Sequence, residues 1–316
     1  MDFKQLQSFI TVVKYGSFTK AAEVLYTSQP TISSHIRNLE DELSTRLLVR
    51  TTKSLSVTPH GMEFYEWAVN TMKSRDSLLR RWSDDTKRII RLGASTIPAA
   101  YILPEILPAF GEKNPNVYFI INQSDSRGVI DDLLQGTIDI GFTGIPADHE
   151  LLTCIPFYED RMVIITPVNE HFLSWQSAKT PDLHEIMQEP VILREKDSDS
   201  KKSADYLIES LGLTEHDLNV IARVNDQESI KNLVTGGLGI SIISEKAAQD
   251  LRREKRILVF QLPENTSRRQ LYINYHKDYI YKNYMKDFIE HVRNFYPLPS
   301  PLAAVPWAGS NSKELP

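Results

Sequence analysis

The sequence predicts a chain of mixed α/β class, in which an all-helical N-terminal part precedes two lobes of alternating strands and helices. Three observations lead to this prediction. Apolar residues recur at helical spacing up to about residue 87, and from residue 89 short apolar runs alternate with helical stretches. The length of 316 residues is enough for about two domains with a hydrophobic core each.

The composition is that of an ordinary globular protein, with 41% hydrophobic and 24% charged residues. No apolar run approaches the ~18 residues of a membrane span, and the N-terminus has neither the basic nor the apolar region of a secretory signal. The single cysteine, Cys154, cannot form an intrachain disulfide and is best interpreted as a small buried hydrophobe. We therefore expect a cytoplasmic protein with no membrane partner.

Charge is distributed unevenly along the chain. Residues 1–92 hold 14 Lys and Arg against 10 Asp and Glu, whereas residues 93–316 hold 22 against 31. The overall net charge of −5 is therefore the sum of a mildly basic N-terminal part and an acidic remainder. The basic part suits a polyanionic partner, and we expect a different function for the acidic part.

The first 43 residues have the pattern of three helices. Residues 3–14 carry an apolar face, and Ser17 is a suitable N-cap for a short second helix through Leu25. Ser28 is a suitable N-cap for a third helix that begins at about Gln29, with Pro30 in its first turn. A short helix, a tight turn and a longer helix make a helix-turn-helix unit, and "RLLVRTTKSLSVT" behind it predicts a two-stranded wing.

The third helix has an unusual polar face. Opposite the apolar stripe that starts at Ile32 lie short hydroxyls and one guanidinium instead of the usual Lys and Glu mixture. For an isolated helix we would favour plain solvation. The preceding turn and the following wing instead favour a major groove of double-stranded DNA, where short side chains allow close approach and Arg can bind guanine. The predicted DNA contacts are Gln29, Pro30, Thr31, Ser33, Ser34 and Arg37 on the helix, and Arg50, Thr51 and Lys53 in the wing.

A long helix is predicted from about Pro59 to Lys87. Apolar and small residues follow a 3-4 spacing on one face, which is typical of a helix that pairs with another helix: Phe64, Trp67, Thr71, Ser74 and Leu78. We favour pairing with a second copy of the chain, and packing within the chain is the alternative.

From Ile89 the chain alternates strands with helices, which predicts βαβ units around a parallel sheet in two lobes of about 80 residues each. The first lobe has strands in "RIIRLGAS", "VYFIINQSDS" and "TIDIGFTG". The second has strands in "DRMVIITP", "EPVILRE", "NVIARVND" and "LGISIIS", with a helix after "DSDSKK". Residues 297–316 are rich in Pro, Ser and Ala without a period, so we expect a disordered tail.

Small polar side chains follow several predicted strands, where ligands of open α/β sheets bind. Each is individually more typical of a helix N-cap, but together they predict a cleft that holds a small anion or carboxylate. The predicted effector contacts are Ser95, Thr96, Ser124, Ser126, Thr143, Ser198, Ser200 and Asn225, with Gln227 as a weaker candidate. Arg127, Lys196 and Lys201 would be able to neutralise an anion, but we favour solvation for them.

Enzyme motifs are absent from the sequence, which has no GxSxG, CxxC or HExxH pattern, no phosphate-binding glycine loop and no metal spacing among its histidines. We expect no catalytic residue, no metal and no cofactor. A solute-binding protein of a transporter is the rival class, and the missing secretory signal and the helix-turn-helix argue against it.

The chain resembles the LysR-type transcriptional regulators over residues 1–296. The resemblance rests on "LQSFITVVKYGSFTKAAEVLYTSQPTISSHIRNLEDEL" with "RTTKSLSVTPHG", and on "LPEILPAFGEKNPNV", "LLQGTIDIGF" and "LVTGGLGISIIS". It implies a winged helix-turn-helix at 1–58, a dimerisation helix at 59–88, and a two-lobed effector domain of periplasmic-binding-protein fold at 89–296, its lobes being 89–162 with 268–296, and 163–267.

The resemblance also implies how such a chain acts. Two linker helices would pair into a dimer, effector domains would associate further into a tetramer, and a ligand between the lobes would change the spacing of the DNA-binding domains, with RNA polymerase as a further partner. Ser95, Thr96 and Thr143 match positions that hold ligands in the family's regulators of sulfur metabolism.

Three residues depart from the family pattern. Ser44 stands where Gly is common, Leu48 where Phe is common, and Ser34 where a basic residue is frequent. We expect the first two to loosen the turn into the wing, and the third to make DNA recognition more dependent on Arg37 and the wing.

Overall fold

The computed structural model describes residues 1–50, 55–82, 88–176, 182–195, 198–279 and 281–296. The chain forms two compact units, the first made of Met1–Thr86 with Gln135–Thr137 and the second of the rest. The predicted tail at 297–316 lies outside the described residues. Among the helices described, none is long and apolar enough to cross a membrane.

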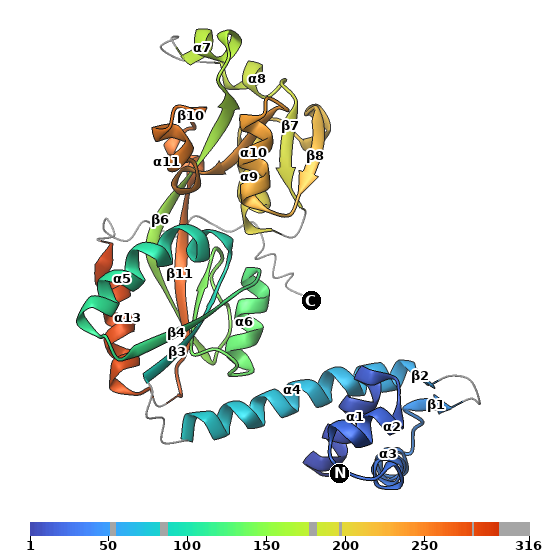
Figure 1. The fold of residues 1–316 in the computed structure, drawn as a ribbon. Coiled ribbons are helices and arrows are strands. Elements are labelled where there is room, and N and C mark those ends of the chain that lie inside the picture. Colours follow the sequence, from blue (N-terminus) through green and yellow to red (C-terminus); the bar gives the residue numbers. More distant parts are fainter. Residues whose placement is uncertain (51–54, 83–87, 177–181, 196–197, 280, 297–316) are drawn as a thin grey trace, which may run out of the picture. The chain divides into compact units, whose positions relative to one another are not determined.

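The first unit contains the predicted helix-turn-helix and two-stranded wing (Figure 1). Its elements are α1 (Phe3–Tyr15), α2 (Phe18–Val24), α3 (Gln29–Glu42), β1 (Leu48–Arg50), β2 (Leu55–Val57) and α4 (Pro59–Trp82). The wing strands pair antiparallel, with Val49 opposite Ser56. The predicted start of α3 at Gln29 is confirmed.

Local signals in the sequence determine where these helices begin and end. Gly16 ends α1 in the left-handed conformation, with φ of 61°, and the Ser17 hydroxyl accepts the Lys20 N–H to cap α2. Ser28 caps α3 by accepting the Thr31 N–H. The three helices bury one shared core, and its fully buried members include Phe9, Val12, Ile32, Ile36 and Leu39.

The turn from α3 into the wing is closed by two backbone hydrogen bonds, from Ser44 to Asp41 and from Thr45 to Glu40. Ser44 lies at φ of 48°, in the region that favours glycine. The departure from the family's glycine therefore places a residue with a Cβ in a strained conformation, at a turn that is still hydrogen-bonded.

The second unit is built on one nine-stranded sheet with the order β4-β3-β5-β11-β6-β9-β7-β8, while β10 pairs with β6 outside this path. Its strands are β3 (Arg88–Ala94), β4 (Val117–Gln123), β5 (Ile140–Thr143), β6 (Leu152–Pro167), β7 (Val191–Arg194), β8 (Val220–Val224), β9 (Ile240–Ser244), β10 (Ile257–Gln261) and β11 (Arg268–His276). The strands that the alternating pattern predicted are present.

The predicted parallel sheet is wrong in one respect, because the sheet is mixed. Strands β3, β4 and β5 pair parallel, as do β7, β8 and β9, but β6, β10 and β11 pair antiparallel to their neighbours. The 16-residue β6 begins well before the predicted "DRMVIITP". Its first part pairs with β11 and its last part with β9 and β10, so β6 and β11 connect the two lobes (Figure 1).

Helices cover both lobes of the sheet (Figure 1). They are η1 (Pro98–Ile102), α5 (Leu103–Lys113), α6 (Ser126–Leu134), α7 (Glu170–Gln176), α8 (Leu183–Ile186), α9 (Asp199–Ser210), η2 (Glu215–Asp217), α10 (Gln227–Thr235), α11 (Glu245–Arg253), α12 (Glu264–Ser267) and α13 (Asn283–Phe295). Helix α9 begins at Asp199, so the prediction of a helix after "DSDSKK" was wrong by about one turn. Ser198, not a later residue, caps it by accepting the Lys201 N–H at 3.1 Å.

Candidate functional site

Helix α3 exposes most of the face that the sequence assigns to DNA. Gln29, Pro30, Ser34 and Arg37 are exposed, while Thr31 and Ser33 are half-buried. The Thr31 hydroxyl lies 2.8 Å from the Ser28 hydroxyl, so part of its hydrogen-bonding capacity serves the helix cap.

His35 lies on another side of α3. Its Nδ1 is 2.7 Å from the Ser8 hydroxyl on α1, within the first unit. This contact explains why His35 does not belong with the exposed polar face.

The wing is attached to α3 through a buried carboxylate. Glu40 is 8% exposed, and its Oε1 accepts the backbone N–H groups of Leu47 and Leu48 at 2.9 and 3.1 Å. Its Oε2 accepts from Arg46 at 2.9 Å. The predicted wing contacts Thr51 and Lys53 lie outside the described residues, and Arg50 ends β1.

Tyr26 is a candidate for DNA contact that the sequence reasoning missed. It is 98% exposed, at φ of 50°, in the turn directly before α3. An aromatic side chain in that turn was the available signal, because a tight turn leaves no core for it to join.

The predicted pairing face of α4 divides in two. Phe64 is half-buried and its ring lies 5.2 Å from that of Phe9, so it packs within the first unit, as the alternative interpretation held. Trp67 is 46% exposed and Leu78 is 37% exposed, and Thr71 is half-buried. The exposed residues are thus the part of this face available to a second chain.

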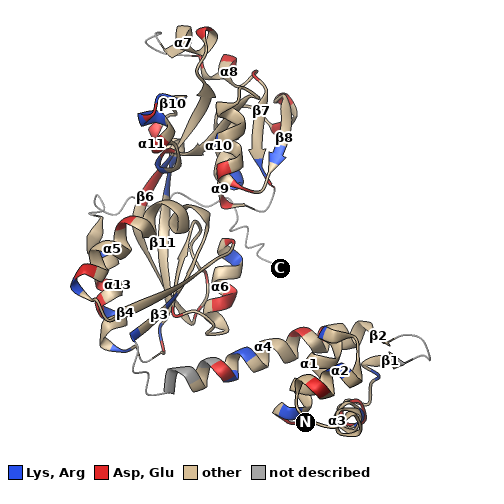
Figure 2. Cartoon of the chain, viewed as in Figure 1, with Lys and Arg blue, Asp and Glu red and all other residues tan. Residues whose placement is uncertain are grey.

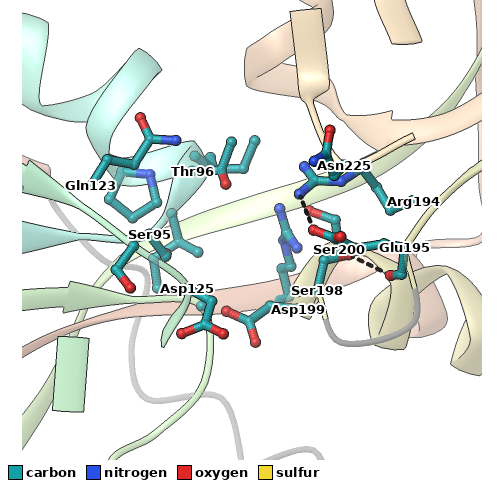
Figure 3. A pocket seen from close by; sticks show the side chains of 16 residues that line it. Ser95, Thr96, Gln123, Asp125, Arg194, Glu195, Ser198, Asp199, Ser200 and Asn225 are labelled. Carbon is teal, nitrogen blue, oxygen red and sulfur yellow. Dashed lines mark hydrogen bonds and ion pairs between the residues drawn. The ribbon is translucent and has the colours of Figure 1, made fainter. Parts of the chain in front are cut away.

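A cavity of about 270 Å³ lies between the two lobes of the second unit (Figure 3). Three loops of the first lobe, three segments of the second lobe and β11 form it. It is lined by Ser95, Thr96, Ile97, Pro98, Gln123, Ser124, Asp125, Gly144, Arg194, Glu195, Ser198, Asp199, Ser200, Asn225, Arg269 and Leu271.

Six of the predicted effector contacts line this cavity: Ser95, Thr96, Ser124, Ser198, Ser200 and Asn225. Their convergence follows from the topology, because the carboxyl ends of the parallel strands of each lobe meet at the same edge of the sheet. Ser198 both caps α9 and lines the cavity, so the two roles that the sequence offered for this residue occur together.

Two other predicted contacts lie beneath the cavity wall. Thr143 is 0% exposed, donates to the Ile145 carbonyl at 2.6 Å and accepts from Asn274 at 2.8 Å. The Ser126 hydroxyl accepts the Gly144 N–H at 3.0 Å and donates to Asp199. Protein groups already use both hydroxyls, so they support the wall instead of lining it. The weaker candidate Gln227 is 2% exposed and also does not line the cavity.

Two arginines of the cavity wall were missed by the sequence reasoning. Arg194 ends β7 and is 7% exposed, and its Nε makes no hydrogen bond to any residue that the structure describes. Burial lowers the pKa of Arg194 while nearby carboxylates, Glu195 first, raise it, and a guanidinium remains charged at neutral pH. Figure 3 shows Arg194 beside Asn225 on the second lobe.

Arg269 of β11 has its charge matched within the protein. Its Nε donates to Asp160 at 2.9 Å, and Asp160 also accepts from Ser244 at 2.7 Å. Basic and acidic segments lie together where β6 and β11 pass between the lobes (Figure 2). This buried ion pair connects the two strands, while Arg194 has only Glu195, 3.9 Å away, as an ion-pair partner among the described residues.

Polar contacts also join the two lobes outside the cavity. Tyr101 of η1 donates to Glu228 of α10, and the Lys246 ammonium of α11 lies 2.6 Å from Glu105 of α5. Burial, then the hydrogen bond to Glu228, raises the pKa of Tyr101. The lobes are therefore held together by several exposed or half-buried polar pairs.

Comparisons with known proteins agree with this architecture. Residues 3–62 match the family of bacterial regulatory helix-turn-helix proteins of the lysR type, and residues 83–296 match the LysR substrate binding domain. An uncharacterized HTH-type transcriptional regulator of Methanocaldococcus jannaschii is 32% identical over 262 residues, which are 81% of this chain and 87% of that protein. The regulator CysL of Bacillus subtilis is 28% identical over 292 residues, 86% and 96% of the two chains.

A solved structure shows the same fold over most of the chain. The crystal structure of full-length CbnR complexed with its target DNA has a TM-score of 0.68 at 22% identity, and covers 93% of this chain and 99% of that one. The polar face on a helix-turn-helix, the cavity between two α/β lobes and the two family matches lead to one conclusion. The chain belongs to the LysR-type transcriptional regulators, which are DNA-binding proteins with an effector-binding domain and not enzymes.

Proposed function

We propose that a small anionic or carboxylated metabolite, bound in the cavity between the lobes, modulates the binding of this regulator to promoter DNA. One observation carries the proposal: Arg194 is 7% exposed in the cavity wall with an Nε that no described residue satisfies. A nearly buried guanidinium whose ion-pair partner among the described residues is 3.9 Å away is short of negative charge, and an anion in the cavity would supply it.

The surrounding donors favour the same kind of ligand. Ser198 and Ser200 stand at the start of α9 and line the cavity, and because the Ser198 hydroxyl donates to the Glu195 carbonyl at 3.2 Å, Ser200 is the donor that supports an anion. Ser95 and Thr96 face them from the first lobe. A ligand that contacts both sides would favour one arrangement of the lobes, and it changes DNA binding only if its affinity differs between arrangements.

A thermal unfolding titration tests this proposal. In buffer free of sulfate and phosphate, we expect carboxylates or small anions to raise the unfolding temperature of the full-length protein. The free energy of unfolding should increase with ligand concentration as RT ln(1 + [L]/Kd). The rise should be lost in Arg194→Gln and kept in Arg127→Gln, since Arg127 is exposed and does not line the cavity. A rise of equal size in all three proteins would place the ligand elsewhere.

For the DNA-binding unit we propose that α3 enters the major groove and the wing contacts the backbone. The proposed groove contacts are Gln29, Pro30, Thr31, Ser33, Ser34 and Arg37, and the proposed wing contacts are Arg50, Thr51 and Lys53. The exposed face of α3 supports this, as does the fold shared with CbnR, whose crystal structure contains its target DNA.

Arg37→Ala tests the groove assignment. On a preferred site selected from random DNA, we expect the change to weaken binding by about 1–3 kcal/mol, as for the loss of a bidentate contact to guanine. The control is Arg75→Ala, which removes an exposed arginine from α4. If both variants bound the selected site like the wild type, Arg37 would not read a base.

We further propose that α4 pairs two chains, that dimers associate into tetramers, and that the bound regulator contacts RNA polymerase. The exposed Trp67 and Leu78 support the first step. The resemblance to the family supports the other two.

A further inference from the structure

Among the described residues that line the cavity, negative charges outnumber positive ones. Three carboxylates, Asp125, Glu195 and Asp199, line it together with the guanidinium groups of Arg194 and Arg269. Asp160 beneath the wall already balances Arg269. A ligand with negative charge alone would therefore meet Arg194 on one side and uncompensated carboxylates on the other.

Two of these carboxylates come from different lobes and line the same cavity. Asp125 stands directly before Ser126 in the first lobe, and the Ser126 hydroxyl donates to Asp199 of the second lobe. Asp125 accepts the Gly128 N–H at 2.7 Å. Neither carboxylate has an ion-pair partner among the residues that the structure describes, and Figure 3 shows both at one side of the cavity.

The positive group lies at another part of the wall. Arg194 ends β7 and stands beside Asn225, which follows β8, in the second lobe (Figure 3). Its Nε has no hydrogen-bond partner among the described residues, and its ion-pair distance to Glu195 is 3.9 Å. The described part of the wall thus has a guanidinium at one place and two carboxylates at another, and no ion pair joins the guanidinium to either of these two carboxylates.

We propose that the effector is a zwitterion, an α-amino acid or a close analogue, with its carboxylate at Arg194 and its ammonium group at Asp125 and Asp199. This inference rests on the proposed function and names the ligand class of the same cavity. The volume of about 270 Å³ suits a small metabolite. A carboxylate at one part and an ammonium group at the other place each charge of the ligand beside wall groups of the opposite charge.

The assignment also explains how the ligand could affect the lobes. Asp199 lines the cavity and at the same time accepts the hydrogen bond that Ser126 donates from the other lobe. The close approach is tight, because a Cβ on Gly144 would lie 3.0 Å from the Asp199 carboxylate. An ammonium group at Asp199 therefore binds where the lobes touch, and it favours the arrangement in which they do.

Matched sets of three compounds test the inference on the full-length protein. Each of the twenty standard L-amino acids is compared, by thermal unfolding and by calorimetry, with its 2-hydroxy acid and its decarboxylated amine. We expect at least one amino acid to bind with a Kd about tenfold or more below that of both of its analogues, because each analogue leaves one part of the cavity unpaired.

Two variants separate the two parts. Arg194→Gln should remove the preference for a carboxylate, and Asp199→Asn, which keeps an acceptor for Ser126, should remove the preference for an ammonium group. Asp131→Asn is the matched control, since Asp131 is an exposed residue of α6 outside the cavity wall.

The outcomes distinguish this inference from the proposed function. If the 2-hydroxy acids bound as tightly as the amino acids, the zwitterion would be wrong and the carboxylate effector would stand. If only the amines bound, both would be wrong. Binding of no compound at millimolar concentration would overturn the zwitterion, while the titration with small anions decides the proposed function. Equal binding in all variants would overturn both.

Discussion

Lys201 is a charged residue whose surroundings the sequence does not reveal. We expected it to be solvated, which is wrong: its side chain is 4% exposed and pairs with Asp205 and, at 2.9 Å, with Glu215. Asp205 lies one helical turn away and could have been anticipated. Glu215 is brought in by the fold, together with Arg223. These pairs fix α9, whose first turn lines the cavity.

Glu215→Gln should destabilise the protein in a pH-dependent way. The hydrogen bond from Lys201, against a smaller effect of burial, holds the pKa of Glu215 below its ordinary value of 4.5. A carboxyl with a depressed folded pKa stabilises the protein above the unfolded pKa and loses that contribution as pH falls through the folded pKa.

The unfolding temperatures of wild type and variant should therefore differ by a constant amount from about pH 8 to pH 5, and converge as the pH falls further. Glu209→Gln, at an exposed position of α9, is the control. A difference that stayed the same in acid would show that the carboxylate charge of Glu215 is not what stabilises Lys201.

Residue types at strand ends could be predicted, but burial and charge balance could not. Ser95, Thr96 and Asn225 were predicted because small polar residues after apolar runs are visible in the sequence. Arg194 was missed because it ends the run "VILR", where an arginine is ordinarily a solvated end of a strand. It pairs with Val224 of β8, which is distant in sequence.

At the scale of elements, the wing depends on one side chain of α3. Glu40→Ala would leave the N–H groups of Leu47 and Leu48 without their acceptor. Each lost hydrogen bond should lower the free energy of unfolding by about 1–3 kcal/mol. We expect a lower unfolding temperature of the first unit and weaker DNA binding, because the wing is no longer held to α3.

Ligand binding by the second unit should be unaffected in Glu40→Ala. Asp41→Ala, at the exposed neighbouring position, is the control and should retain DNA binding. Undiminished DNA affinity in Glu40→Ala would mean that the wing adds nothing to it.

Helix α4 carries the proposed pairing of two chains. Trp67→Ser removes a ring that is 46% exposed and whose centroid lies 5.4 Å from that of the Phe64 ring. We expect a small decrease in the unfolding temperature, and a lower molar mass of the protein particles in light scattering because chains no longer pair. Glu66→Ser, on another side of the helix, should leave the mass unchanged. An unchanged mass in Trp67→Ser would instead favour packing of this face within its own chain.

Elements with a local signal were predicted well and those without one were not. The caps Ser17 and Ser28 and the helical periodicity located α2 and α3. The first part of β6, "LTCIPFYED", shows no simple alternation of apolar and polar residues. Its side chains also do not alternate regularly between buried and half-buried positions along the pairing with β11. Its antiparallel pairing is set by β11, more than 100 residues later, and so is a property of the tertiary fold.

At the scale of the whole molecule, the chain combines a DNA-binding unit with a unit whose cavity lies between two lobes. The asymmetry of charge found in the sequence follows this division, with the basic part in the helix-turn-helix and α4. Regulation requires that ligand binding in one unit change the affinity of the other. By linkage, DNA must then change the affinity for the ligand by the same factor.

The most direct test of the account is therefore the ligand's Kd, measured by calorimetry on the full-length protein with and without the selected DNA site. The ligand is the compound that binds best in the unfolding screen. We predict that saturating DNA changes this Kd about 5-fold or more, which corresponds to the ~1 kcal/mol of a typical coupling. We also predict that Arg194→Gln abolishes ligand binding but keeps DNA binding. Equal values of Kd with and without DNA would contradict the account, since the cavity would then bind a ligand that does not regulate.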